Sequence, residues 1–164
     1  MPEPITILSS ALCVATNAVT LGKQTYDIIN SIRNAPDYIT DLAADLHGLY
    51  VVLGTLQSAL HVEDRKGAQS RFSVEAVENL KDFLENCMKC LNKTSKVVQP
   101  HLKANGGVVR SAWKGFKWDT FKKSDIVILR GQLAHWKLNL SVLCSVYTLL
   151  NQYVHSSSCF RFKH

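Results

Sequence analysis

The sequence predicts an all-α protein, an up-and-down bundle of four long helices with a long loop between the third and the fourth. Four segments repeat apolar residues at alternating steps of three and four, and only eight glycines and four prolines interrupt the 164 residues. Such spacing places the apolar side chains in one stripe along each helix, and the stripes bury one another when helices cross at roughly 20°. At this length we expect one domain with a sizeable core.

The first segment, which begins at Pro4, has no charged residue before Lys23. Hydroxyl and amide side chains lie between its apolar ones, so the segment suits a bundle core and also has the length of a membrane span. Glu3 precedes the apolar run and no Lys or Arg does, which is not typical of a secretory signal. We therefore expect a core helix, one face of which is our candidate for membrane insertion. That face contains Ile5, Leu8, Leu12, Ala15 and Val19, and the stripe continues through Gly22, Tyr26 and Ile29.

The second segment is expected to begin near Pro36, which suits the first turn of a helix, and Asp37 favours the positive end of that helix. A tight turn before it makes the first two helices antiparallel. Its seam runs to about His61 and is almost purely leucine. The seam contains Ile39, Leu42, Leu46, Leu49, Leu53, Leu56 and Leu60.

The third segment follows a charged loop that contains Gly67, and Ser73 offers it an N-terminal cap. Pro100 ends or kinks this helix. Its seam contains Val77, Leu80, Leu84, Cys87, Leu91, Thr94 and Val98.

Residues 101–121 contain three glycines and no sustained apolar period, which predicts the long loop. The fourth helix is expected to run from Ser124 to the serines at 156–158. Its seam contains Ile126, Leu129, Leu133, Trp136, Leu140, Leu143, Tyr147, Leu150 and Val154. The predicted organisation is one bundle over residues 2–155 and a short polar and basic tail over residues 156–164.

The positive charge lies in the last third of the chain. Residues 1–100 hold nine Lys or Arg and eleven Asp or Glu. Residues 101–137 hold eight Lys or Arg and only two Asp or Glu, and the tail adds two more cations. Within this basic region, cations alternate with aromatic rings. Indole rings favour a membrane interface and lysines attract anionic headgroups, so we expect an anionic-lipid patch here. The patch contains Arg110, Trp113, Lys114, Lys117, Trp118, Lys122 and Lys123.

Two other interpretations of this patch stay open. Trp113, Trp118 and Phe121 can instead cap one end of the bundle, with the lysines merely solvated. Aromatic rings with cations also suit single-stranded nucleic acid, but no signature of a nucleic-acid-binding fold accompanies them, so we do not expect that partner.

The sequence lacks recognisable catalytic and metal-binding motifs. Cys87 and Cys90 form a C-x-x-C, but no second C-x-x-C or paired histidines supply the other ligands of a structural zinc. The six histidines are dispersed, and no serine has the G-x-S-x-G elbow. The five cysteines, an odd number, suit packing thiols in an intracellular protein. We expect no enzyme activity, cofactor, metal or small-molecule substrate.

Several stretches of the chain resemble one known family. They are Pro4 to Leu12, Tyr26-Asp27-Ile28-Ile29, Asn34-Ala35-Pro36, Leu42 to Leu60, Trp113 to Trp118, Phe121-Lys122-Lys123 and Leu133 to Ser141. Together they are similar to the HeLo-like N-terminal domain of fungal STAND receptors, a family also labelled azaphilone pigment biosynthesis cluster protein L N-terminal domain. The resemblance covers about residues 2–150 and implies a HeLo-like helical bundle.

The resemblance implies an effector or signalling domain of a NOD-like receptor, linked to programmed cell death or heterokaryon incompatibility through oligomerisation and inducible membrane association. A NACHT or NB-ARC module and repeats usually follow such a domain, and the 164 residues contain no Walker-type glycine-rich loop. The alternative is a homotypic interaction or adaptor bundle without membrane activity, including a regulatory role in a secondary-metabolite cluster. We expect further copies or other helical domains as partners, an anionic membrane surface as an additional one, and a cytoplasmic location with recruitment to the plasma membrane.

Overall fold

The computed structural model describes residues 4–31, 35–66, 73–98 and 123–160, and it places the side chains of residues 6–31, 35–66, 73–98 and 123–149. These residues form four helices and no strand: α1 (Pro4–Asn30), α2 (Asp37–Lys66), α3 (Val74–Val98) and α5 (Lys123–Phe160). The predicted all-α four-helix bundle is therefore confirmed. The long loop expected over residues 101–121 lies outside the described residues.

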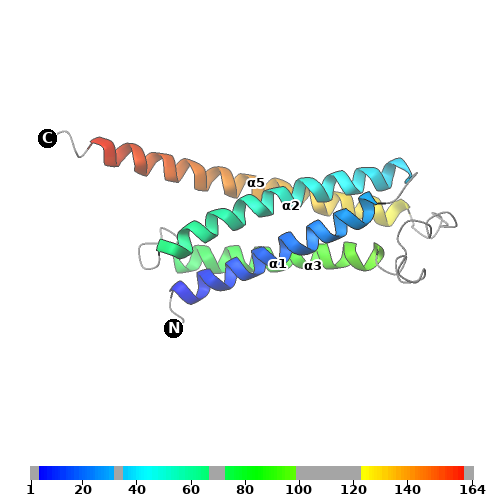
Figure 1. Ribbon diagram of the computed structural model, residues 1–164, viewed down its shortest axis with the longest axis horizontal. Coiled ribbons are helices and arrows are strands. Elements are labelled where there is room, and N and C mark those ends of the chain that lie inside the picture. The colour runs from blue at the N-terminus through cyan, green and yellow to red at the C-terminus, as the bar shows by residue number, and fades with distance from the viewer. Residues whose placement is uncertain (1–3, 32–34, 67–72, 99–122, 161–164) are drawn as a thin grey trace.

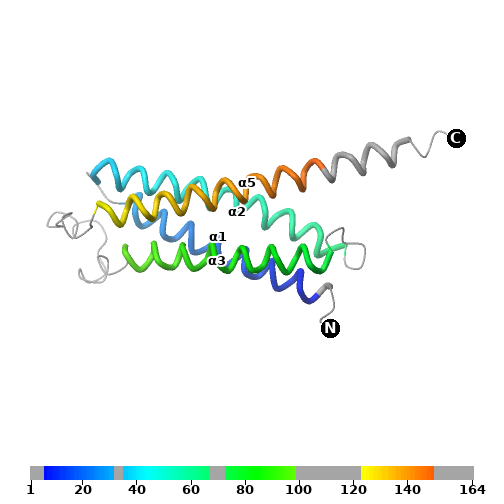
Figure 2. The backbone as a smooth tube through the Cα atoms, turned by 180° about the vertical axis from the view of Figure 1, so that it is seen from behind, coloured from blue at the N-terminus to red at the C-terminus, as the bar shows by residue number. Residues whose placement is uncertain are grey.

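The helices run alternately up and down (Figure 1). α1 packs against both α2 and α3, whereas α5 packs chiefly against α2 and meets α3 at few points. Although they are consecutive among the described helices, α2 and α3 do not pack side by side. The C-terminal part of α5 extends past the ends of the other helices (Figure 1). In the view from behind, the coloured part of α5 runs alongside α2 (Figure 2). One edge of the bundle, between α3 and α5, is consequently open.

The leucine seam of α2 forms the centre of the core. All seven predicted seam positions are buried, and most of them are completely inaccessible to solvent. This seam is covered from two sides, because α1 and α5 both pack against α2. The helix begins at Asp37, one residue after Pro36, whose carbonyl oxygen accepts the Ile39 N–H at 2.9 Å.

α1 buries smaller residues than the sequence predicted. Leu12, Val19 and Tyr26 are only partly buried. Ala11, Ala18 and Thr25 are buried instead, together with Ile7, Leu8, Ala15, Gly22 and Ile29. Small residues are favoured here because α1 lies against two helices at close range: a Cβ atom added at Gly22 would lie 3.0 Å from the Cβ of Tyr50. The buried residues of α1 thus recur at the predicted spacing, but the buried face is centred on the small side chains and not on the large ones.

α3 begins as predicted, because the Ser73 hydroxyl caps it and accepts the N–H of Ala76 at 3.2 Å. Every predicted seam position of α3 is buried. Among the placed side chains of α5, the buried ones are Ile126, Leu129, Leu133 and Leu140. The predicted seam residues Trp136 and Tyr147 are partly buried, and the side chains of Leu150 and Val154 lie outside the described residues. Leu143, which the spacing placed in the seam, is 41% exposed, and the helix continues past the predicted tail boundary to Phe160.

Candidate functional site

An apolar face of α5 points away from the bundle. Leu138 and Leu149 are 64% and 65% exposed, and Val142 and Val146 are 55% and 49% exposed. These four residues, which we name the outer face of α5, follow one another at steps of four, four and three, so they lie on one side of the helix. The opposite side carries the buried Leu133 and Leu140. The middle of α5 is therefore apolar on two sides, and only the side with these two leucines is buried in the bundle.

Arg130 fastens the first part of α5 to the first turns of α2. Its Nε donates to Asp45 Oδ2 and its Nη1 donates to Asp41 Oδ2, each at 2.8 Å. The hydrogen bond to Asp45 is the main reason why the pKa of Arg130 is raised above its usual value. Because 35% of the Arg130 side chain is exposed, solvent screens these ion pairs, and we expect them to contribute at most about 1 kcal/mol. They mainly orient α5 on α2.

A second polar link between α2 and α5 involves a buried carboxylate. Glu63, near the end of α2, is completely buried. Its Oε1 accepts a hydrogen bond from the Tyr147 hydroxyl of α5 at 3.0 Å, and the Lys66 ammonium group donates to the same oxygen. A carboxylate removed from water needs such partners to remain charged. Tyr147 therefore fixes α5 at a point well beyond Arg130.

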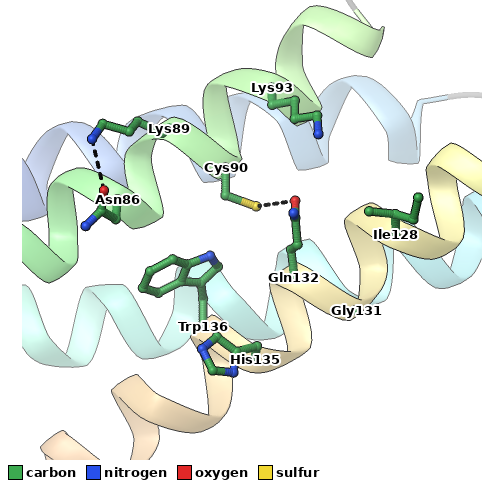
Figure 3. A pocket seen from close by; sticks show the side chains of 9 residues that line it. All are labelled: Asn86, Lys89, Cys90, Lys93, Ile128, Gly131, Gln132, His135 and Trp136. Carbon is green, nitrogen blue, oxygen red and sulfur yellow. Dashed lines mark hydrogen bonds between the residues drawn. The ribbon is translucent and has the colours of Figure 1, made fainter.

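α3 and α5 diverge to leave a groove of about 650 Å³, which we name the α3–α5 groove (Figure 3). It is lined by Asn86, Lys89, Cys90 and Lys93 from α3 and by Ile128, Gly131, Gln132, His135 and Trp136 from α5. The Trp136 ring packs edge-on against Phe83, with ring centroids 4.7 Å apart. Across the groove, the Cys90 thiol donates to Gln132 Oε1 at 3.7 Å. These contacts give the groove a fixed, largely apolar floor.

The predicted membrane-inserting face of α1 lies within the bundle. Leu8 and Ala15 are buried, and Leu12 and Val19 are partly buried against the core. The side chain of Ile5 lies outside the described residues. For these side chains to meet lipid, α1 would have to leave its contacts with both α2 and α3.

Most of the predicted anionic-lipid patch lies outside the described residues. This holds for Arg110, Trp113, Lys114, Lys117, Trp118 and Lys122. Lys123 is the first residue of α5 and is exposed.

The two cysteines of the C-x-x-C lie on α3, and both are buried. Burial raises the pKa of the Cys87 thiol to about 12, and it also raises the pKa of Cys90. Since the thiolate is the form that ligates metals and attacks electrophiles, these thiols are suited to packing, in agreement with the sequence prediction. In the parts of the chain that the structure describes, no three His, Cys, Asp or Glu side chains are grouped as metal ligands would be.

Within the described ranges, α2 is the helix that is long and apolar enough to cross a membrane by length and composition. The same property is typical of the central helix of a bundle, and the buried leucine seam gives α2 that position.

The outer face of α5 and the α3–α5 groove were not predicted from the sequence. A signal for the first was present: residues 138–160 contain no Asp, Glu, Lys or Arg, a charge-free stretch longer than the one noted in the first segment. The groove had no such signal. Its residues come from two helices, α3 and α5, and no local pattern in the sequence shows how far apart these helices lie.

A protein-family model described as pigment biosynthesis cluster protein PigL N-terminal matches residues 2–164. The chain belongs to this family. The PigL N-terminal family is the one whose label the sequence resemblance predicted, so that prediction is confirmed. No curated protein and no solved structure matches the chain.

Proposed function

We propose that this PigL N-terminal domain is a non-enzymatic signalling module that associates with a second copy of itself or with other helical domains. The observation that carries the proposal is the outer face of α5: Leu138, Val142, Val146 and Leu149 are each about half exposed or more. Contiguous apolar residues on a surface are typical of interaction sites. Over these residues the face is about 16 Å long, given the rise of an α-helix.

Charge supports self-association at this face in particular. The chain carries a net charge of +6, so two copies repel each other at most approaches. The outer face lies in a stretch, residues 138–160, without any charged residue. Two such faces can therefore meet without bringing like charges together, and the contact would remove the exposed leucines and valines from water.

Sedimentation velocity over a range of protein concentrations tests this proposal. We expect the parent chain to self-associate, and we expect Val142→Glu to abolish the association because it places a carboxylate in the centre of the apolar contact. Val51→Glu is the matched control, since Val51 is 47% exposed on α2, close to the 55% of Val142. A parent chain that stays monomeric at high concentration, or equal behaviour of the two variants, would contradict the proposal.

The second candidate function is inducible membrane association, as in a cell-death or incompatibility effector that is recruited from the cytoplasm to the plasma membrane. Its support is the uncharged segment from Pro4 to Gly22 and the basic and aromatic residues before α5. In this mechanism the basic residues bind anionic lipid, and α1 leaves the bundle and inserts.

Co-sedimentation with vesicles separates this candidate from an adaptor that never meets a membrane. We expect binding to anionic vesicles at low salt and none to neutral ones. The charge-reversed variant, with Lys114, Lys117, Lys122 and Lys123 changed to Glu, should stay in the supernatant. If the parent stays in the supernatant at low salt, as the variant does, the membrane mechanism is contradicted and the homotypic adaptor is favoured, which includes a regulatory role in a secondary-metabolite cluster.

A further inference from the structure

The α3–α5 groove carries a positive charge that its own lining does not neutralise. Lys89 and Lys93 project from successive turns of α3, and none of the nine lining residues is Asp or Glu. Lys89 donates to the side-chain oxygen of Asn86 at 2.9 Å, which is a neutral partner (Figure 3). Lys93 also acts on Cys90, which lines the groove: burial raises the pKa of the Cys90 thiol, and the positive charge of Lys93 opposes that increase. The groove therefore favours a negatively charged occupant.

The floor of the groove offers an apolar contact beside these cations. Ile128 is 55% exposed, and Trp136 is held in place by its edge-on contact with Phe83. Gly131 has no side chain, and a Cβ atom added there would meet no atom within 4 Å. The groove thus has room above an apolar surface, between two helices that run antiparallel.

The residues that line the groove form one face on each of its two helices, and a trough between two helices suits a third helix as its occupant. On α3 they recur at positions 86, 89, 90 and 93, and on α5 at 128, 131, 132, 135 and 136. Each helix thus presents about two turns of one face to the groove. A helix lying in a trough between two others is a common mode of peptide recognition, with apolar anchors at a spacing of three and four.

The chain's own connecting segments do not suit this groove. Residues 99–122 carry five Lys or Arg and one Asp, and residues 67–72 carry one Arg and no acid. Like charges repel, so these segments are poor partners for Lys89 and Lys93.

We propose that the α3–α5 groove binds an acidic amphipathic helix of a partner protein. Its carboxylates pair with Lys89 and Lys93, and its apolar side chains rest on Ile128 and Trp136 and fill the space above Gly131. This site shares no residue with the outer face of α5, which begins at Leu138, seven residues after Gly131 on the same side of the helix. Changes at Lys89, Lys93 or Gly131 therefore leave the residues of the proposed self-association unchanged.

Two glycines of the chain provide a matched pair of variants. Gly131 and Gly54 both lie inside helices, and a Cβ atom added at either would meet nothing within 4 Å. Either substitution removes a glycine from a helix interior, which favours the helix. Gly131→Glu fills the groove and adds a negative charge, whereas Gly54→Glu places the same side chain on α2, outside the lining.

The probe is a fluorescently labelled peptide of about four helical turns, built of Ala, Glu and leucines at the spacing i, i+3, i+4 and i+7. A second peptide has every Glu replaced by Lys. Fluorescence anisotropy should show binding of the acidic peptide and none of the basic one. We expect Gly131→Glu, and separately the double variant Lys89→Glu with Lys93→Glu, to weaken binding by about tenfold or more, because each brings like charges together. Gly54→Glu should bind as the parent does.

Circular dichroism establishes that each variant is folded. The two lysines are exposed, so their variant keeps the test decisive even if Gly131→Glu does not fold. The proposal is overturned if the acidic peptide binds no more tightly than the basic one, or if Gly131→Glu and Gly54→Glu bind equally. It is also overturned if the acidic peptide does not bind, whereas anionic phospholipid vesicles do bind and their binding requires the same two lysines. The groove would then be a lipid contact.

Discussion

Leu133 and Leu138 lie on the same helix, one turn and a half apart, but on opposite sides of it. Leu133 is completely buried against the core, whereas Leu138 is 64% exposed on the outer face of α5. Changing each in turn to alanine removes the same atoms from the same helix. The comparison therefore tests which side of α5 belongs to the bundle.

The expected losses of stability differ because the two side chains differ in burial. Leu133→Ala should lower the free energy of unfolding by about 2–5 kcal/mol, since it removes buried carbons and leaves a cavity. Leu138 has only about a third of its surface removed from water. Full burial of a leucine contributes about 1.5–3 kcal/mol, so Leu138→Ala should cost about 0.5–1 kcal/mol. The slightly better helix propensity of alanine lowers that cost further.

Urea unfolding, followed by far-ultraviolet circular dichroism, measures both losses. A slope of about 1–3 kcal/mol per molar urea converts the expected loss for Leu133→Ala into a midpoint shift of about 1 M or more. Measurements at two protein concentrations separate any contribution of self-association, which depends on concentration. If the two variants lose equal stability at low concentration, or if Leu138→Ala loses more, the assignment of the two faces of α5 is wrong.

Four further outcomes follow from the packing. Gly22→Val should destabilise the chain by about 1–3 kcal/mol in the same urea assay, since its Cβ would lie 3.0 Å from the Tyr50 Cβ, whereas Gly54→Val should change stability little. Iodoacetamide should alkylate the exposed Cys13 rapidly at neutral pH but reach the buried Cys87 only after unfolding, as mass-spectrometric mapping would show; equal rates would contradict the structure. Because the pKa of Cys87 is raised to about 12 in the fold, its contribution to stability is complete below the usual thiol pKa of 9.0 and should disappear as the pH rises from about 9 to 12, which urea midpoints across that range would detect. Tyr147→Phe should cost about 1–2 kcal/mol by removing a hydrogen bond to a buried carboxylate, and a change within error would refute that role of the hydroxyl.

The helices of the fold could be predicted because each seam is local in the sequence. The leucine seam of α2 is the clearest case, since all seven positions chosen by spacing are buried. The prediction for α1 was less accurate, because it favoured large residues such as Leu12 and Val19. Which side of a helix is buried depends on how closely its neighbours approach, and that distance is a property of the assembled bundle.

The candidate sites were harder to predict than the helices. A seam prediction assigns one buried face to each helix, so a second apolar face, such as the one that contains Val142 and Val146, is easily counted as part of the core or overlooked. The α3–α5 groove depends on which helices are neighbours. α3 follows α2 among the described helices but packs on α1, and no local pattern of residues specifies that choice.

The one-sided attachment of α5 sets the order in which the bundle opens. α1 is held by two neighbours, whereas α5 depends chiefly on α2, with Arg130 and Tyr147 as its polar links. Opening of α5 alone would leave α1 packed against both α2 and α3, with α1 still covering the leucine seam of α2 from one side. Backbone amides of α5 should therefore exchange with deuterium through a partial opening of lower free energy than the one that releases the amides of α2. By this hierarchy, the helix most ready to change partners is the last one and not the uncharged first one.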